Sequence, residues 1–197
     1  TQLVFLYLYY AENTGSVNLT QIAKALSLSK ATCTRAINDL SASGLISQTA
    51  EGTNKWITTA YTKSELLEKA YGRLKTPVDR ILYVKGTAQI EHPIASGIRA
   101  LARQSMIGVN DQDGAIAISK KEAAKIPAED ICTKQYFEDF GGAVIEVWSY
   151  DPIILERDGC VDDISLLLSM DNDPNERVQT CLDEIRQKHG LPIKEEE

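Results

Sequence analysis

Apolar residues in the first part of the chain recur three and four positions apart, as they do along one face of a helix. This pattern predicts a first helix over residues 3–10. It also predicts a short second helix that begins with Thr20 as its N-cap, and a third helix over residues 30–42 with Ser29 as its N-cap. Only a tight turn separates the second helix from the third. Two helices joined in this way are typical of a helix-turn-helix.

The segment after the third helix has the pattern of a β-hairpin. Gly44 ends the helix, because glycine readily adopts the conformation of a helix C-terminus. Residues 45–47 and 55–58 have the pattern of two short strands on either side of the polar residues 49–54. Helix, tight turn, helix and hairpin is the element order of a winged helix-turn-helix, and we predict this fold for residues 1–58.

The rest of the chain mixes helical and strand patterns. Thr62 and Glu65 form a capping box for a fourth helix, whereas residues 80–85 fit either a buried strand or a last helical turn. Beyond them, Asp173 is the predicted N-cap of the last helix. The remaining patterns predict helices over residues 94–106, 120–126, 164–170 and 174–189 and strands over residues 115–119 and 143–150. The sequence therefore predicts an α+β fold, a winged helix-turn-helix followed by an α+β domain with a smaller sheet.

Charge is distributed unevenly along the 197 residues, whose formal net charge is −7. Residues 1–85 hold ten Lys or Arg against six Asp or Glu, a net +4, and residues 86–197 hold eleven against twenty-two, a net −11. The first part can approach phosphates, and the second would repel them. We therefore expect residues 1–85 to be a DNA-binding domain with a connecting helix. Residues 86–197 are then an acidic domain for dimerisation, sensing or partner binding.

The third helix carries the candidate DNA-reading residues. Its expected buried stripe of Cys33, Ile37 and Leu40 directs a small, polar and basic face outward. From that face Arg35 can pair with guanine and Asn38 with adenine, as these side chains do in the major groove. The residues predicted to contact double-stranded DNA are Ser29, Lys30, Ala31, Thr32, Thr34, Arg35, Asn38, Asn54 and Lys55.

The other predicted contacts follow from position. Ser29 and Lys30 lie at the start of the helix, where the helix dipole favours phosphate, and Ala31 and Thr34 can contact a thymine methyl group. Asn54 and Lys55 belong to a wing that can follow the flanking backbone or the minor groove. The alternative is that the polar face of the third helix is only solvated surface.

Other kinds of chemistry have weaker support in the sequence. The four cysteines are far apart and form no Cys-x-x-Cys pair, so we predict buried free thiols rather than a zinc or redox site. Six aspartates between residues 151 and 173 allow a metal-dependent enzyme as an alternative. Asp151, Asp173 and either Asp162 or Asp163 are more simply explained as turn and cap residues. We expect no enzyme, no cofactor and no metal.

Four segments of the first part carry a resemblance to a known family. They are residues 19–26 (LTQIAKAL), 29–32 (SKAT), 35–40 (RAINDL) and 44–46 (GLI). Together they resemble the winged helices of MarR-type regulators. The resemblance implies a transcriptional regulator, most simply a repressor, that binds palindromic DNA as a homodimer. We expect such a protein to be cytoplasmic and without a membrane segment.

A second resemblance involves residues 97–102 (GIRALA) and 146–152 (EVWSYDP). These segments look like the domain that follows a winged helix in antitoxins of the abortive-infection type. The resemblance implies an alternative function, an antitoxin or adaptor. In that case the acidic domain binds a protein partner, such as a nucleotidyltransferase-like toxin, and DNA binding serves autoregulation.

Overall fold

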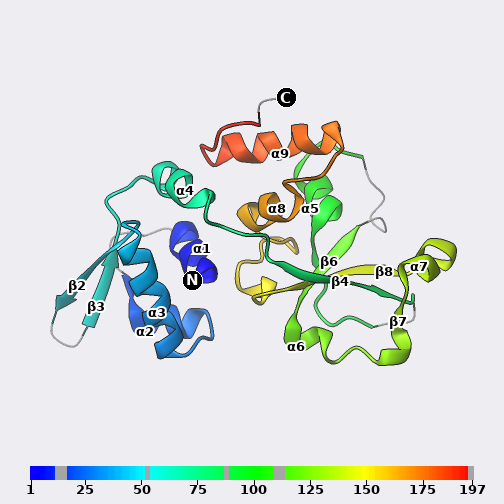
Figure 1. Ribbon diagram of the computed structural model, residues 1–197, viewed down its shortest axis with the longest axis horizontal. Coiled ribbons are helices and arrows are strands. Elements are labelled where there is room, and N and C mark those ends of the chain that lie inside the picture. The colour runs from blue at the N-terminus through cyan, green and yellow to red at the C-terminus, as the bar shows by residue number, and fades with distance from the viewer. Residues whose placement is uncertain (12–16, 52–53, 87–88, 109–113, 195–197) are drawn as a thin grey trace. The chain divides into compact units, whose positions relative to one another are not determined.

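The computed structural model describes residues 1–11, 17–51, 54–86, 89–108 and 114–194. They form two compact units (Figure 1). The first unit comprises Thr1–Leu74 and Arg186–Glu197, and the second comprises Lys75–Ile185. Both combine helices with strands, so the predicted α+β class is confirmed. Within the described ranges, none of the helices combines the length and the apolar character that a membrane crossing requires.

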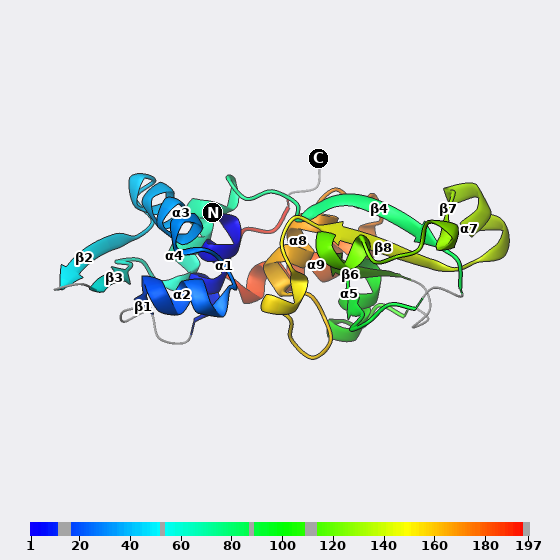
Figure 2. The same cartoon turned by 90° about the horizontal axis from the view of Figure 1, so that it is seen from below.

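The first unit has the predicted order of helix, tight turn, helix and hairpin. Its elements are α1 (Gln2–Tyr10), β1 (Val17–Asn18), α2 (Leu19–Ala25), α3 (Lys30–Ala42), β2 (Ser47–Glu51), β3 (Asn54–Thr58) and α4 (Lys63–Tyr71). The strands form an antiparallel sheet in the order β1-β3-β2. In Figures 1 and 2 the β2–β3 hairpin lies beside α3, as a wing does beside a recognition helix.

The helix caps of the first unit agree with the sequence at two of three positions. Ser29 caps α3 by accepting a hydrogen bond from the Thr32 amide at 3.1 Å. Thr62 and Glu65 cap α4 as predicted, and the hydrogen bonds from Thr62 lower the pKa of the Glu65 carboxyl. The prediction that Thr20 caps α2 was wrong, because the helix begins one residue before it.

The cap of α2 is Asn18. Its side-chain oxygen accepts a hydrogen bond from the Thr20 amide at 2.7 Å, and Gln21 Oε1 accepts one from the Asn18 amide at 3.1 Å. This reciprocal pair satisfies two backbone donors at the helix start, which a cap at Thr20 would leave without partners.

The hairpin is longer than the sequence predicted. Residues 49–51, expected in the loop, belong to β2, where Glu51 is the register partner of Asn54. Pairing with β3 extends β2 because the hydrogen bonds of the ladder stabilise residues whose own strand propensity is low. β1 adds to the other side of β3, with Val17 opposite Ile57. Residues 52 and 53 lie outside the described ranges.

The helices of the first unit pack around an apolar core. α1 is buried on most of its surface, including Val4, Phe5 and Leu6 at 1% exposure or less. α3 buries Cys33, Ile37 and Leu40, as predicted, together with Ala36. Because only this stripe faces the core, the opposite side of α3 remains exposed.

The second unit is built around a five-stranded sheet. Its strands are β4 (Val78–Val84), β5 (Ile94–Ala95), β6 (Ala115–Ser119), β7 (Ile131–Cys132) and β8 (Ala143–Trp148), in the order β5-β6-β8-β4-β7. β6 and β8 are parallel, and the other neighbours are antiparallel. Its helices are α5 (Gly97–Gln104), α6 (Lys120–Ala123), α7 (Lys134–Phe140), α8 (Asp163–Met170) and most of α9 (Glu176–Lys188), with short 3₁₀ turns at Ala128–Asp130 and Pro152–Ile154.

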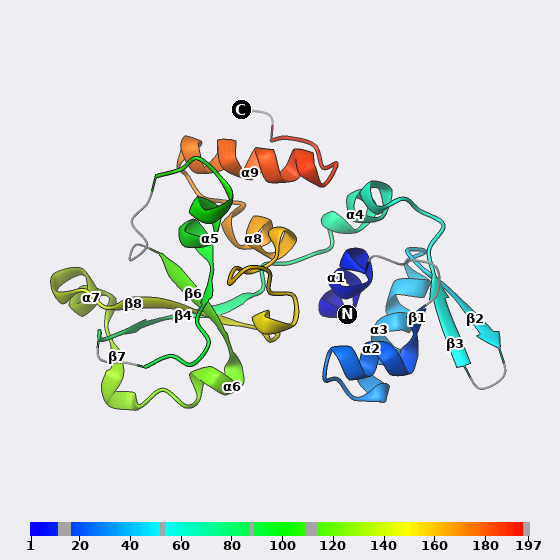
Figure 3. The same ribbon diagram turned by 180° about the vertical axis from the view of Figure 1, so that it is seen from behind.

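Helices cover both faces of this sheet. α6 lies on one face, where Ile145 and Val147 of β8 form a buried cluster with Ile116 and Ile118 of β6. α5 and α8 lie on the other face, as Figures 1 and 3 show from opposite sides. Since side chains alternate along a strand, Glu146 and Trp148 point to the α5 and α8 side.

The structure corrects several predicted boundaries. Residues 80–85 lie largely within a strand, because β4 pairs along its length with β8, and this pairing places β4 in the second unit. The expected division into residues 1–85 and 86–197 therefore differs from the two compact units. The helix expected over residues 94–106 is the strand β5 followed by α5.

Two further differences concern the end of the chain and its cysteines. α9 begins at Glu176, and the predicted cap Asp173 instead accepts a hydrogen bond from the Asn175 amide at 2.9 Å, before the helix. The prediction of free cysteines is confirmed, although only Cys33 and Cys160 are fully buried. Burial raises the pKa of the Cys33 thiol.

Candidate DNA-binding surface

The exposed side of α3 brings together most of the predicted DNA-contacting residues. Lys30, Ala31, Arg35 and Asn38 are exposed along the helix, and Ser29 is exposed at its N-terminus. Thr32 and Thr34 are half-buried. We call the exposed side defined by Lys30, Ala31, Arg35 and Asn38 the α3 face.

At the start of α3 the hydroxyl groups are already engaged with each other. Ser29 Oγ lies 2.9 Å from Thr32 Oγ1 and also accepts the Thr32 amide. Thr34 Oγ1 donates a hydrogen bond to the Lys30 carbonyl at 2.8 Å. Ser29 therefore stabilises the start of the helix as its cap. The hydroxyls of all three side chains already have partners within the helix and its cap, so any contact with DNA would come in addition to these bonds.

Arg35 and Asn38 differ in their surroundings. The Arg35 guanidinium makes no hydrogen bond or ion pair with any residue in the described ranges. Asn38 Oδ1 instead accepts a hydrogen bond from Gln48 Nε2 at 3.2 Å. Arg35 is thus available to a base or a phosphate, and Asn38 is held by the hairpin.

Gln48 is a residue of this surface that the sequence reasoning missed. It lies in β2 opposite Ile57 of β3, which is 3% exposed. Directly paired residues of an antiparallel sheet point to the same face, so Gln48 shares the face that buries Ile57. That register explains how Gln48 reaches α3. The signal in the sequence was a polar residue at an inward position of a strand.

The hairpin residues are less completely described. Asn54 and Lys55 begin β3, and their side chains lie outside the part of the chain that the structure describes. Trp56 is half-buried and pairs with Thr49 on one side and Asn18 on the other. Because paired residues share a face, Trp56 lies on the same face as the exposed Thr49, opposite the face that buries Ile57.

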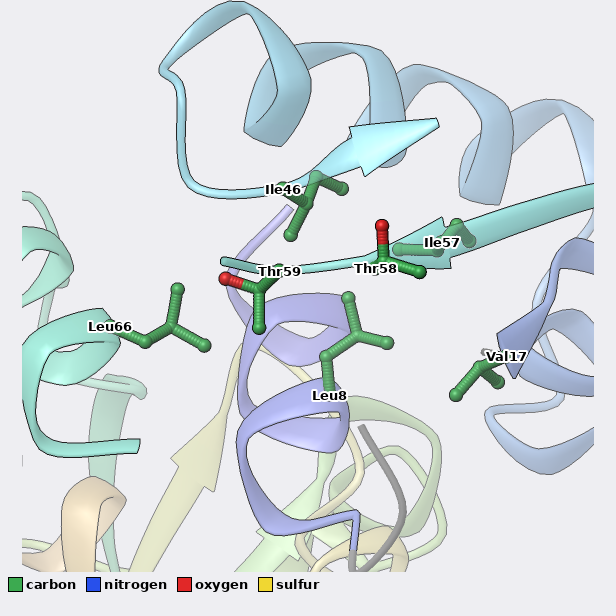
Figure 4. Close-up of a pocket in the computed structure, with 7 residues that line it drawn as sticks. All are labelled: Leu8, Val17, Ile46, Ile57, Thr58, Thr59 and Leu66. Carbon is green, nitrogen blue, oxygen red and sulfur yellow. The ribbon is translucent and has the colours of Figure 1, made fainter. Parts of the chain in front are cut away.

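A small apolar cavity lies behind the hairpin (Figure 4). Leu8 of α1 points toward Ile46 and Ile57, and Leu66 of α4 closes another side. The cavity has a volume of about 20 Å³, which is room for one water molecule. Ligand sites typically have several hundred cubic ångströms. The cavity is therefore a packing defect of the first unit and not a ligand site.

Two aspartates of the predicted acidic cluster accept hydrogen bonds from the backbone. Asp162 accepts the Ser165 amide at 3.0 Å as the N-cap of α8, and Asp151 accepts the Ile153 amide at 3.2 Å. The described part of the chain holds no group of three or more His, Cys, Asp or Glu side chains arranged to bind a metal ion. The predicted structural roles of these two aspartates are confirmed.

Comparison with known proteins bears mainly on the first unit. Residues 1–55 match the model of the MarR family. The matched segment spans α1, α2, α3 and β2 and reaches the start of β3, so it contains all the predicted DNA-contacting residues. It supports a MarR-type winged-helix regulator, which is a class of DNA-binding transcriptional regulators and not of enzymes. Searches of curated proteins and of solved structures gave no match.

Proposed function

We propose, with the MarR-type segment as the premise, that the chain is a sequence-specific transcriptional regulator that acts as a repressor. In this proposal α3 enters the major groove and the β2–β3 hairpin follows the adjacent backbone. The observation that carries it is the α3 face, on which Arg35 has no partner among the described residues. An exposed guanidinium on a short polar helix face fits the bidentate recognition of guanine.

The other side chains have different proposed roles. Asn38 would read adenine through the amide that Gln48 orients. Ser29 and Lys30 would meet phosphate at the positive end of the α3 dipole, and Thr32 would support that end of the helix. Ala31 and Thr34 would contact a thymine methyl group. Asn54 and Lys55 would contact the backbone beside the groove.

The proposed active form is a homodimer in the cytoplasm. The net charge of residues 1–85 is only +4, so one copy would neutralise few phosphates and bind weakly. Two copies would read two half-sites about one helical turn, or 10 base pairs, apart. Sedimentation with and without DNA would test this, and a monomer bound to a single half-site would contradict it.

Selection of binding sites from a random DNA library tests the function itself. We expect the full chain to enrich one palindromic sequence, and Arg35→Ala to lose discrimination at one base position of each half-site. Arg73→Ala is the matched control, because Arg73 is an exposed arginine outside α3. No enriched sequence, or equal loss in the two variants, would contradict the proposal. A reporter gene downstream of the selected site separates a repressor from an activator.

A second candidate function rests on the net charge of −11 in residues 86–197. An antitoxin or adaptor would use this acidic part to bind a basic protein partner, and DNA binding would then serve autoregulation. Co-expression of the full chain with the product of the neighbouring gene, followed by size-exclusion chromatography, tests it. A complex that forms at low salt and dissociates at high salt would favour this function. Separate elution of the two proteins at low salt would count against it.

A further inference from the structure

The second unit contains an open cleft on the side of the sheet that α5 and α8 cover. Its volume is about 580 Å³, which is in the range of sites for small organic molecules. The walls come from the start of α5, the start of β6, β8 and the end of α8. Small and apolar residues predominate among those that line it, including Gly97, Ala115, Leu168 and Met170.

Glu146 is the charged group deepest in this cleft. It lies in β8, the middle strand of the sheet, and only 9% of it is exposed. Trp148 Nε1 donates a hydrogen bond to Glu146 Oε2 at 3.0 Å, and the buried Ser96 hydroxyl lies close to the carboxyl. The carboxyl is therefore held in a fixed orientation by neighbours that carry no charge.

Gly97 borders the space next to the Glu146 carboxyl. Gly97 has φ of +53°, a conformation that favours glycine, and a Cβ added there would lie 3.5 Å from Glu146 Oε1. A larger residue at this position would thus narrow the approach to Oε1. The combination of a glycine and a buried carboxyl leaves one carboxylate oxygen beside the cleft.

Glu146 has no cationic partner among the residues that the structure describes. Buried carboxylates are ordinarily paired with a cation, because an isolated buried charge is costly. Burial raises the pKa of Glu146, and the hydrogen bond from Trp148 and the nearby Ser96 hydroxyl oppose that rise without cancelling it. A positively charged ligand would supply the missing partner.

We propose that this cleft binds a small organic cation, with a protonated amino group on Glu146 and an apolar body against Leu168 and Met170. An anion would be repelled by Glu146 and by Asp173 at the cleft edge. A bare metal ion is a poorer fit, because the described residues place no group of three or more His, Cys, Asp or Glu side chains together here to hold one. The proposal concerns the second unit alone and does not depend on the proposed DNA-binding function.

Isothermal titration calorimetry of the full chain with butylammonium tests the proposal. We expect saturable binding of butylammonium, and none of 1-butanol or butyrate at the same concentrations. Glu146→Gln keeps the size of the side chain and an acceptor for Trp148, and it should weaken binding at least tenfold. Glu138→Gln removes an exposed carboxylate on α7 and should leave binding unchanged. No binding of butylammonium, or equal binding of butanol, would overturn the proposal.

A second variant tests the proposal even if Glu146→Gln fails to fold. Ser169 is half-buried and lines the cleft from α8, and Ser169→Tyr would place a large ring inside the cleft while Glu146 stays in place. We expect this variant to lose butylammonium binding and to keep the melting temperature of the wild type to within a few degrees. Unchanged binding in folded Ser169→Tyr would show that the cation binds elsewhere and would overturn the proposal.

Discussion

Asn38 of α3 and Gln48 of β2 are joined by a side-chain hydrogen bond of 3.2 Å, from Gln48 Nε2 to Asn38 Oδ1. The bond connects the helix that would read base edges to the hairpin that would follow the backbone. It leaves the Asn38 amide in a defined orientation before any DNA is present. Preorganisation of this kind increases affinity, because less side-chain freedom is lost on binding.

Replacement of Gln48 by alanine should therefore weaken DNA binding at the base that Asn38 reads. The expected loss is about 0.5–1.5 kcal/mol, the usual net contribution of one hydrogen bond. Fluorescence anisotropy with the selected duplex and with duplexes altered at single positions would measure it. Thr49→Ala is the control, because Thr49 is the exposed neighbour on the opposite face of β2. Equal affinities of wild type and Gln48→Ala would show that the bond has no role in recognition.

The two central side chains of the α3 face should act at different bases. Arg35→Ala and Asn38→Ala should each lose about 1–3 kcal/mol at one position of the site and little at the others. Competition with singly substituted duplexes measures this discrimination, and Arg73→Ala again controls for the loss of a positive charge. If both variants bind as tightly and as selectively as the wild type, α3 is not the recognition helix.

Lys55 should contribute to affinity without contributing to specificity. A phosphate contact is insensitive to base sequence, so Lys55→Ala should weaken binding to specific and unrelated DNA alike. The slope of log K against log salt should decrease in magnitude by about one unit. Titrations between low and moderate salt on two duplexes would measure both quantities. A loss confined to the selected duplex would instead assign Lys55 to base reading.

The parts of the fold that local signals determine could be predicted from the sequence. α3 and its cap Ser29 follow from helical spacing and a side chain that bonds three residues ahead. Pairing between distant segments has no local signal. The strand β4 was therefore ambiguous until β8 provided its partner, and Gln48 was missed because its neighbour Asn38 lies on another element.

The cleft of the second unit could not be predicted from the sequence, because it too depends on contacts between distant segments. Glu146 stands out in the sequence only as a charged residue within the apolar run of β8. Its significance comes from the cleft, which α5, α8 and the sheet form together. No periodicity could reveal that enclosure. The edge strand β7 was likewise missed, because Ile131–Cys132 is too short to show alternation. The helix α7 was missed because it is short and buries none of its residues.

The corrected cap of α2 has a measurable consequence for stability. Asn18→Ala should destabilise the first unit by about 1 kcal/mol, the usual effect of losing a helix N-cap. Thr20→Ala should have a much smaller effect, because the Thr20 hydroxyl is exposed and its backbone amide, which the substitution keeps, makes the cap bond. Urea unfolding followed by circular dichroism would compare the two variants. A larger loss of stability for Thr20→Ala than for Asn18→Ala would show that Thr20 is the cap, as the sequence predicted.

The stability of the second unit should depend on pH through Glu146. Burial raises the pKa of this carboxyl in the folded state, so the folded protein binds its proton more tightly than the unfolded chain does. Below the ordinary pKa of glutamate, about 4.3, the Glu146 carboxyl is protonated in both the folded and the unfolded protein, and it does not reduce the free energy of unfolding. As the pH rises through that value toward the raised pKa, the Glu146 carboxyl ionises in the unfolded chain before it ionises in the folded protein. The free energy of unfolding therefore falls. Glu146→Gln carries no titrating group at this position.

The melting temperature of Glu146→Gln should therefore exceed that of the wild type by an increasing margin as the pH rises from about 4 toward neutrality. Differential scanning calorimetry of both proteins across this range isolates the effect, because every other titrating group is shared. Glu138→Gln, at an exposed carboxylate on α7, should show no such trend. A margin that is constant with pH would mean that Glu146 has its ordinary pKa in the folded protein. A margin that shrinks would mean that a positive charge stabilises the carboxylate without any added ligand.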